Sequence, residues 1–462
     1  MSKIEENLEQ LNKEGLIELV KLLSGRVKTL ERRVEQLLDR PKSEKKVKKT
    51  PENSSVPPSR AEKGNIEEKA KAKRGPKLGH VGKSRERVEA DEIIDCHLEF
   101  CGECGHNLEE AKHWLVGRHQ VIDIAPIKPF VREARRYRVI CPCCKKQQTA
   151  NYVEGFEKGR KFGANLESLC LYLHYAHPLS YKRVRDILQE MCALSISNGA
   201  VQNLVSRSQA KIEQASQVIH EQVKRATVVG SDETGARVKG INYWQWVFQT
   251  PNWVYNVIKP SRSSDNIREV MDNAQVEVWV SDVLSSQMCH PARQYQICLA
   301  HQVRDLQYEI DNQDCQWAKD MQELFYQSMK LKQNREAYDL HQFQEKVENF
   351  ECELDKLLDI YPTHADSERL RHRFVKHRKA LLLFLHREDV PPTNNASEQA
   401  LRNSVIYRKV TGGFRSDWGA ELYADIISIL ETARRQGLEI FSTLVAILRG
   451  QAVFDNPLCL GV

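Results

Sequence analysis

Three acidic residues stand where carboxylates could act together on metal ions. Asp232 and Asp282 each close a short apolar run, and Glu398 lies in Thr393-Asn-Asn-Ala-Ser-Glu, which is typical of the first turn of a helix. Carboxylates from two strand ends and one helix start can converge on one point. Mg²⁺ or Mn²⁺ prefers carboxylate oxygen, and a pair of such ions cuts and joins phosphodiester bonds. These residues therefore predict a two-metal site for phosphodiester chemistry.

Two Cys-x2-Cys pairs give a second chemical signal. Each pair can present two thiolates from a tight turn, so four sulfurs would form a tetrahedral Zn²⁺ site. Four thiolates leave no open coordination position, which favours a structural role for this ion. Cys96 and Cys143 are alternatives for one ligand. The expected zinc ligands are Cys101, Cys104, Cys141 and Cys144.

Composition limits the setting in which this chemistry takes place. The chain has 462 residues, a net charge of +6 and 13 cysteines. It has no run of about 18 apolar residues, so no membrane span is expected. The N-terminus is charged from its third residue and lacks a signal-peptide core, so we expect a cytoplasmic protein. Residues 41–89 carry 15 Lys and Arg against 7 Glu, which suits a nucleic-acid partner.

The N-terminus has the clearest helical periodicity. Over residues 16–37, Leu and Val alternate at spacings of four and three, with Leu at each d position and Val at each a position. This choice favours a parallel two-stranded coiled coil, and an amphipathic helix packed on its own chain is the alternative. We expect residues 1–40 to be a dimerisation helix, and the protein to form a homodimer or a higher assembly.

Residues 41–90 are expected to be a basic flexible linker. Pro, Ser, Lys and Glu dominate this stretch, and large apolar residues are scarce. Its basic side chains around Arg-Gly-Pro resemble the small hooks that enter an A·T minor groove, and a charged tether is the alternative. The residues expected to contact DNA in this hook are Arg74, Lys77, Lys83 and Arg85.

Two segments between the linker and Asp232 would complete the DNA-binding part. Residues 91–150 are expected to be a zinc-binding domain, with an alternating β-ribbon over residues 131–140 between the cysteine pairs. Residues 151–222 are expected to be helical, with a helix-turn-helix-like pair whose second helix has Ser197 as N-cap. Such pairs are also common structural units. The residues expected on its groove-facing side are Gln202, Asn203 and Arg207.

Residues 223–430 change to a strand pattern and end in helices. Three strand-like runs, a polar helix start at Ser263 and two further strand-like runs predict the order β-β-β-α-β-α-β-α. Three antiparallel strands followed by parallel ones are the order of a ribonuclease-H-like domain. Residues 312–388 are charged and poor in strand formers, so we expect a helical insertion there. Residues 431–462 would be a C-terminal tail. The expected fold class is thus multidomain α/β.

Several motifs together carry a family resemblance. They are Ser231-Asp-Glu-Thr-Gly235, Cys298-Leu-Ala-His301, Asn394-Asn-Ala-Ser-Glu-Gln-Ala-Leu-Arg402 and Gly412-Gly-Phe-Arg-Ser-Asp-Trp-Gly419, besides the coil, the Arg-Gly-Pro motif and the cysteine pairs. From about residue 70 to 440 the chain resembles the DDE transposases of the insertion sequence sixty-six family. The resemblance implies that Asp232, Asp282 and Glu398 are the catalytic metal ligands. It also implies that Cys298 and His301 lie near the active site, with Arg402 one helical turn after Glu398.

The resemblance implies a transposase that binds the terminal inverted repeats of an insertion sequence. Hydrolysis at the element end would free a 3′-hydroxyl, which then attacks target DNA without ATP. The partners would be double-stranded DNA and accessory proteins of the same element. This chain departs from the family in one place, because Val283-Leu-Ser-Ser follows Asp282 where a Gly-Tyr segment is typical. Glu421 is the reserve candidate for the third ligand.

Two other functions share most of these features. A transposase-derived DNA-binding protein without catalysis would need only the coil, the zinc module and the helix pair. A metal-dependent nuclease without strand transfer would share the fold and the acidic residues. Joined DNA products, as opposed to cut ones alone, separate these alternatives from a transposase.

Overall fold

The computed structural model describes residues 27, 49–50, 53, 86–157, 159–272, 274–290 and 292–454. The chain divides into two compact units, one with residues 1–61, 133–186 and 196–462, the other with residues 62–132 and 187–195. The predicted coil over residues 1–40, except Val27, lies outside the described residues. So do all four basic residues of the predicted hook, Arg74, Lys77, Lys83 and Arg85.

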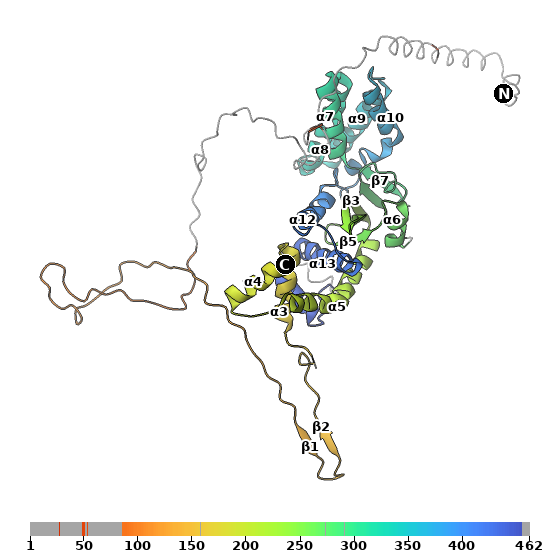
Figure 1. Cartoon of the computed structure of the whole chain (residues 1–462). Helices are drawn as coiled ribbons and strands as arrows, with labels where there is room; N and C mark the ends of the chain where they lie inside the picture. Colours follow the sequence, from red (N-terminus) through yellow and green to blue (C-terminus); the bar gives the residue numbers. More distant parts are fainter. Residues whose placement is uncertain are drawn as a thin grey trace. The chain divides into compact units, whose positions relative to one another are not determined.

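A five-stranded mixed sheet forms the centre of the larger unit (Figure 1). Its strands are β3 (Val228–Val238), β4 (Ile241–Gln249), β5 (Val254–Lys259), β6 (Val278–Ser281) and β7 (Gln294–Ile297). They lie in the order β5-β4-β3-β6-β7. The first three strands are antiparallel to one another, and β6 and β7 run parallel to β3. The predicted directions of all five strands are therefore confirmed.

The first strand is longer than predicted, which changes the setting of Asp232. In the sequence, the two glycines at 235 and 240 indicate a turn over residues 235–240, but β3 continues to Val238 and only Lys239 and Gly240 make the turn. Both turn residues have positive φ, 50° and 80°, as a tight two-residue hairpin turn requires. Asp232 therefore lies inside β3 and not at its end. It does lie beyond the part of β3 that pairs with β6.

The connection between β6 and β7 also differs from the prediction. A helix was expected there, but the described residues between Ser281 and Gln294 form turns and bends. A proline at position 291 and the absence of a helical apolar period explain why no helix forms over this short segment. The loop begins directly after Asp282 and so belongs to the surroundings of that residue.

Helices cover both faces of the sheet. On one face, α6 (Ser264–Met271) packs on Trp246 and Trp279, both of which are fully buried. On the other face lie α12 (Asn395–Thr411) and α13 (Asp417–Arg435) (Figure 1). Because side chains alternate along a strand, successive residues of β3 face these two different layers.

The segment before the sheet is helical, as predicted. It contains α3 (Ala164–Leu171), a π-helical turn (Tyr172–Ala176), α4 (Tyr181–Cys192) and α5 (Asn198–Lys224). Ser197 caps α5, since its side chain accepts the backbone N–H of Ala200 at 3.1 Å. The cap prediction is confirmed, although α5 is far longer than a recognition helix, and its apolar side packs on α13.

The described C-terminal residues, up to 454, are not a separate tail. The boundary predicted at residue 430 falls inside α13, and α14 (Ile440–Leu448) follows it closely. Leu444, Ile447 and Leu448 are buried in the same core as α5 and α13. An amphipathic helix such as α14 is stable when its apolar side packs on other helices. The prediction of a tail did not include this packing.

Residues 312–388 are helical, as predicted, and have their own apolar core (Figure 1). The main helices are α8 (Gln316–Gln333), α9 (Leu340–Asp359), α10 (Ala365–Lys376) and α11 (Leu383–His386), with short 3-10 turns at Arg335–Ala337 and Arg378–Ala380. They pack against α7 (Leu299–Gln313), which leads out of the sheet. Within the described part of the chain, no helix has the length and apolar character needed to cross a bilayer.

Asp425 is a partly buried carboxyl group of α13, and burial, with smaller contributions from Glu213 and Glu421, raises its pKa to about 6. The unfolded chain releases this proton near pH 4, so stability should fall as the pH rises from about 4 to 6 and stay level above that. Asp425→Asn should then raise the unfolding free energy by about 1–3 kcal/mol at pH 7 and by less at pH 4. Urea unfolding at both pH values tests this, and equal shifts would point to packing instead of charge.

Candidate active site

The parallel pairing of β3 and β6 brings Asp232 and Asp282 to the same level. Val228 pairs with Val278, and Gly230 pairs with Val280, so each aspartate follows two residues after a paired position. Neighbouring strands lie about 4.8 Å apart. Side-chain alternation also puts Asp232 and Asp282 on the same face as Val278 and Val280, which pack toward α7. The two carboxylates are therefore neighbours on one face of the sheet.

The buried side chain of Asn394 ties the start of α12 to this pair. Its Nδ2 donates to the carbonyl oxygen of Ser231 at 2.7 Å, directly before Asp232. Its Oδ1 accepts the hydroxyl of Ser397 at 2.6 Å. Glu398 then falls in the first turn of α12, where the helix start is anchored to β3.

Gly230 allows this close approach of α12 to the sheet. A Cβ atom at position 230 would lie 3.1 Å from Oδ1 of Asn394 and much closer to the side-chain amide of Gln249. A larger residue would therefore push on the group that anchors α12. The apolar run before Asp232 thus contains a glycine for a packing reason.

The carboxylates influence one another electrostatically. The pKa of Asp232 is raised well above its usual value, mainly by burial, then by the neighbouring charge of Glu233 and also by Asp282 and Glu398. Each added negative charge makes ionisation of Asp232 less favourable. Asp282 and Glu398 are thus near enough to Asp232 for their charges to act on its carboxyl group.

Glu233 is a fourth carboxylate of the site, which the sequence reasoning missed. Its side chain is 1% exposed and is held by ion pairing with Arg262 and by a hydrogen bond from Gln287. Burial raises its pKa, the hydrogen bond from Arg262 lowers it, and the charge of Asp282 raises it again. Because Gln287 belongs to the loop after Asp282, Glu233 fixes that loop. Its place beside Asp232 in the Ser-Asp-Glu-Thr-Gly motif was the available signal.

The start of α7 adds nitrogen and sulfur groups next to Glu398. Cys298 is fully buried, and its backbone N–H donates to Ser281 at 2.8 Å, while its Sγ accepts the backbone N–H of Asn394 at 3.1 Å. His301 Nε2 and Arg304 Nη2 lie 3.6 Å and 3.4 Å from Oε1 of Glu398. Arg304 was missed in the sequence, although a residue three positions after His301 shares its helix face.

Basic residues of α12 differ in their surroundings. Arg402 is exposed on the helix surface. Arg408 is partly buried and points toward β3, with Nη2 3.0 Å from the hydroxyl of Thr234, and burial lowers its pKa. Arg402 is thus accessible to a ligand, whereas Arg408 contacts the strand that carries Asp232.

Two of the residues of α5 that were predicted to face a DNA groove, Gln202 and Asn203, are exposed. Arg207 is also exposed, but its guanidinium pairs with the buried carboxylate of Glu167 at 2.6 Å. Arg160 pairs with the same carboxylate at 3.1 Å. Arg207 therefore stabilises the helix packing, and DNA would have to compete for its charge.

The two cysteine pairs have the same local geometry. The backbone N–H of Cys101 donates to the oxygen of His106, and that of Cys141 donates to Lys146, both at 2.9 Å. The fifth residue of each turn has positive φ, 73° at Gly105 and 58° at Lys145. Backbone N–H groups within each turn lower the pKa of Cys101 and of Cys141. Each turn on its own thus stabilises a thiolate, the form that binds zinc.

The second cysteine pair is at the tip of a short hairpin. Its strands are β1 (Arg138–Ile140) and β2 (Gln147–Thr149), which pair antiparallel. The ribbon predicted over residues 131–140 therefore forms only at its end, because the pairing partner follows the cysteine turn and is short.

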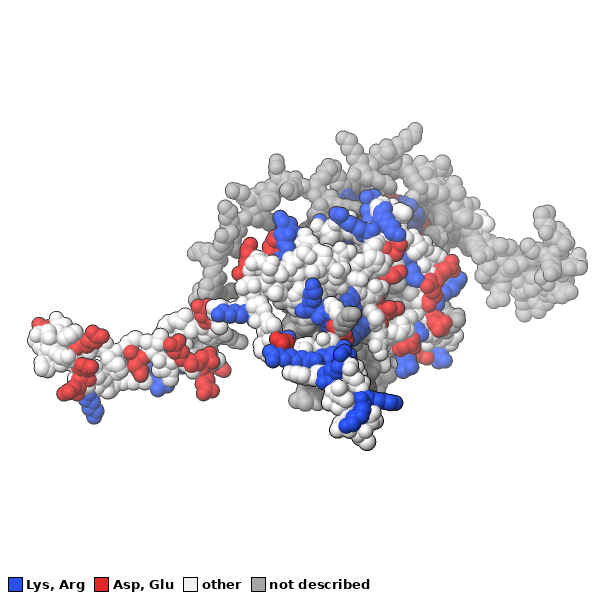
Figure 2. Space-filling model, turned by 60° about the horizontal axis from the view of Figure 1, so that its bottom comes forward, with Lys and Arg blue, Asp and Glu red and all other residues white. Residues whose placement is uncertain are grey.

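The charges differ between the hairpin and the residues before it. Lys and Arg occupy five of the positions 135–146 and no acidic residue does, while residues 86–132 carry ten acidic and five basic residues. Figure 2 shows Lys and Arg in blue and Asp and Glu in red on one face of the molecule.

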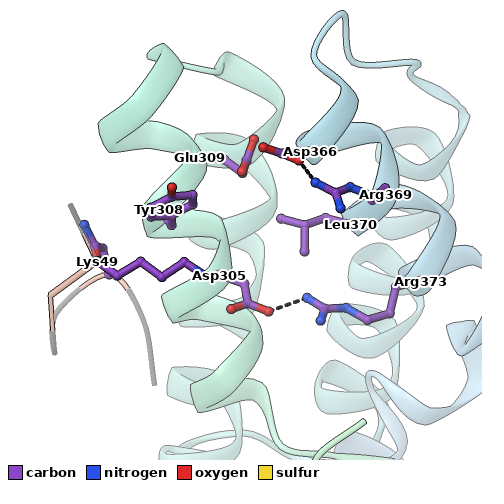
Figure 3. A pocket seen from close by; sticks show the side chains of 9 residues that line it. Lys49, Asp305, Tyr308, Glu309, Asp366, Arg369, Leu370 and Arg373 are labelled. Atoms are coloured by element: carbon purple, nitrogen blue, oxygen red, sulfur yellow. Dashed lines mark hydrogen bonds and ion pairs between the residues drawn. The ribbon is translucent and has the colours of Figure 1, made fainter. Parts of the chain in front are cut away.

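A separate hollow of about 540 Å³ lies between α7 and α10 (Figure 3). Its charged groups are already paired, with Asp305 2.6 Å from Arg373 and Asp366 next to Arg369. Lys49 also lines it, with its ammonium 5.4 Å from the ring centre of Tyr308. Since an arginine neutralises each of these two aspartates, they offer little net charge to a cation.

Comparison with known proteins assigns the family. The sequence model described as "Transposase IS66 family" matches residues 159–422. This range covers more than half of the chain and includes all three predicted metal ligands, so the protein belongs to the IS66 transposase family. The family prediction is confirmed.

Part of the chain is similar to the uncharacterized protein y4jO of Sinorhizobium fredii. The two are 29% identical over 89 residues. The aligned part is 19% of this chain and 28% of that protein's length.

Proposed function

We propose that this protein is an active transposase that binds the ends of an insertion sequence and cuts and joins DNA at the site of Asp232, Asp282 and Glu398. Two observations carry the proposal: the register of β3 and β6 puts Asp232 and Asp282 at the same level, and Asn394 anchors the helix turn of Glu398 to Ser231. The strand order, with three antiparallel strands and then two parallel ones, supports a ribonuclease-H-like catalytic domain.

The donor set fits divalent metal ions. Asp232, Asp282 and Glu398 offer only oxygen atoms. Burial, and then the nearby charges of Glu233, Asp282 and Glu398, raise the pKa of Asp232, and a cation would offset both effects. These residues would hold two Mg²⁺ or Mn²⁺ ions. When bound, such ions supply charge stabilisation for the attacking and leaving oxygens of a phosphodiester.

The other residues of the site would keep this arrangement in place. Asn394 orients the first turn of α12, and with it Glu398. Glu233 holds the loop after Asp282 through Gln287. Arg304 would balance the charge of Glu398 before the ions bind. This pre-organisation matters because a shift of about 1 Å in a reacting group can cost about 10²-fold in rate.

DNA would be held by parts outside the sheet. The β1–β2 hairpin is rich in Arg and Lys and suits phosphates, whereas the acidic residues 86–132 do not. The exposed Gln202 and Asn203 would contact the element end. A structural Zn²⁺ at Cys101, Cys104, Cys141 and Cys144 would order the module around the two cysteine turns. Dimerisation through residues 1–40 would place two copies on the paired ends.

Arg402 is expected to contact a DNA phosphate, because it is exposed one turn after Glu398. Arg402→Ala should slow cleavage about tenfold and flatten the salt dependence of DNA binding by about one unit of slope. Arg268→Ala on α6, which packs on the opposite face of the sheet, is the matched control and should change neither. An unchanged cleavage rate at fixed salt would remove Arg402 from the site.

The direct test is a Mg²⁺-dependent assay on labelled DNA that carries the flanking repeats of the encoding element. Wild type is run beside Asp232→Ala and Glu398→Ala, and cut products, joined products and DNA binding are measured. We expect cutting and joining in the wild type alone, with binding in all three proteins. Cutting without joining would favour the nuclease alternative. Binding without cutting in all three would favour a DNA-binding protein without catalysis.

A further inference from the structure

A group of mixed ligands lies at the edge of the carboxylate site. Cys298, His301 and Glu398 each offer one ligand atom, and these three atoms lie within 4.8 Å of one another. They come from two helix starts, α7 and α12, that the hydrogen bond from Asn394 to Cys298 holds together at 3.1 Å. Ligands from two anchored helices define a fixed site, which a flexible surface cluster would not.

The sulfur atom of Cys298 is held in a fixed, buried position beside Glu398. It is fully buried and accepts a backbone N–H, which is the type of outer contact that supports a metal ligand. Cys298 also follows β7 directly and hydrogen-bonds to the end of β6, so its position is determined by the sheet. Little conformational entropy of the Cys298 backbone therefore has to be lost when a metal ion binds.

The ring of His301 provides a second, independent observation. Its Nδ1 atom is buried and has no hydrogen-bond partner in the described part of the protein. Its Nε2 atom lies 3.6 Å from Oε1 of Glu398. No hydrogen bond between described residues occupies Nδ1, and Nε2 faces the carboxylate, so a ring nitrogen is available as a metal ligand.

We propose that Cys298, His301 and Glu398 form a binding site for a zinc-class transition-metal ion. Sulfur and imidazole nitrogen select Zn²⁺, Co²⁺ or similar ions over Mg²⁺, which prefers oxygen. Three protein ligands leave one coordination position open. The proposal rests on the proposed function only in that Glu398 is shared with the catalytic carboxylates, and the binding itself requires no DNA.

Arg304 opposes metal binding at this site in the metal-free protein. Its Nη2 lies 3.4 Å from the oxygen of Glu398 that also faces His301. An incoming cation would have to displace this guanidinium or use the other carboxylate oxygen. Removing the positive charge with Arg304→Gln should therefore tighten metal binding, by roughly tenfold if one ion pair of about 1.4 kcal/mol is lost.

The experiment measures Co²⁺ binding to the full chain without DNA. Cys96, Cys101, Cys104, Cys141, Cys143 and Cys144 are changed to Ser, so that the cysteine turns do not contribute. We expect one Co²⁺ with a sulfur-to-cobalt absorption band. The band should be absent in Cys298→Ser, and His301→Asn should weaken binding by at least about tenfold. Cys170→Ser, which also removes a fully buried thiol, is the control and should retain the band.

Loss of the band in the control, or its persistence in Cys298→Ser, would overturn the proposal. So would the absence of any band in the starting protein. If Cys298→Ser does not fold, as judged by circular dichroism, His301→Asn decides, because its unchanged affinity would exclude the site. Asp232→Asn should keep the cobalt band and lose Mg²⁺-dependent cleavage. A failed cleavage assay with an intact band would therefore count against the proposed function alone.

Discussion

Asp232→Asn is expected to abolish DNA cleavage and joining while making the metal-free protein more stable. The substitution keeps the size of the side chain and removes a ligand, so the rate should fall by about 10³-fold or more. The carboxyl group is buried next to Glu233, Asp282 and Glu398, and these surroundings raise its pKa. Ionising it in the folded protein therefore costs free energy that the unfolded chain does not lose.

The sign of the stability effect follows from that raised pKa. A group whose folded pKa lies above its unfolded value destabilises the protein once the pH rises above the unfolded value, near 4. At neutral pH and without metal, Asp232→Asn should raise the melting temperature by roughly 2–4 °C, the shift expected for about 1 kcal/mol in a domain of this size. Added Mg²⁺ should stabilise the wild type and have little effect on the variant.

Asp314→Asn is the matched control for this prediction. Asp314 is exposed, lies in a left-handed conformation that asparagine also adopts, and is outside the candidate site. It should leave cleavage, metal-free stability and the Mg²⁺ effect unchanged. If Asp232→Asn lowered the metal-free melting temperature, the carboxylate would be a structural partner, and its assignment as a metal ligand would be wrong.

Signals that depend on neighbouring residues in the sequence were predictive. Ser197 and Ser263 precede helices, and both side chains accept backbone N–H groups at the start of α5 and α6. The directions of the five strands followed from the order of apolar runs and turns. Local rules suffice here because a cap or a tight turn is determined by a few adjacent residues.

Features that depend on pairing across the fold were not predictable in the same way. Gly235 indicated a turn, but β4 pairs with β3 beyond it, so the strand continues to Val238. The C-terminal residues gave no sign of the core formed by α5 and α13, on which α14 packs. Each of these outcomes is decided by a partner that is distant in sequence.

In the candidate site, too, some residues could be predicted from their local sequence and others only from the fold. The types and settings of Asp232, Asp282 and Glu398 led to their prediction as site residues, and the register of β3 and β6 puts the two aspartates at the same level of neighbouring strands. Glu233 was not singled out, although it stands next to Asp232 in the Ser-Asp-Glu-Thr-Gly motif. Its contact with the loop after Asp282 only becomes visible when Gln287 is placed beside it.

Asn394→Ala is the second substitution for which we expect a large effect. The change removes the donor that binds the Ser231 carbonyl at 2.7 Å and the acceptor that binds Ser397 at 2.6 Å. Both groups would be left buried without these partners, at a cost of about 1–3 kcal/mol each. Since Glu398 lies one turn away, the start of α12 should shift and cleavage should fall on the order of 10²-fold.

Asn395→Ala distinguishes this role from a general effect on α12. Asn395 is the next residue, has the same side chain and is exposed, so its removal should change the cleavage rate less than about twofold, in line with the small effects of surface substitutions. For Asn394→Ala the loss should appear in kcat more than in DNA affinity, and it should persist at temperatures where the variant is fully folded. Recovery of the wild-type rate on cooling would mean that Asn394 only stabilises the protein, because a residue that positions Glu398 must affect the reaction in the folded state.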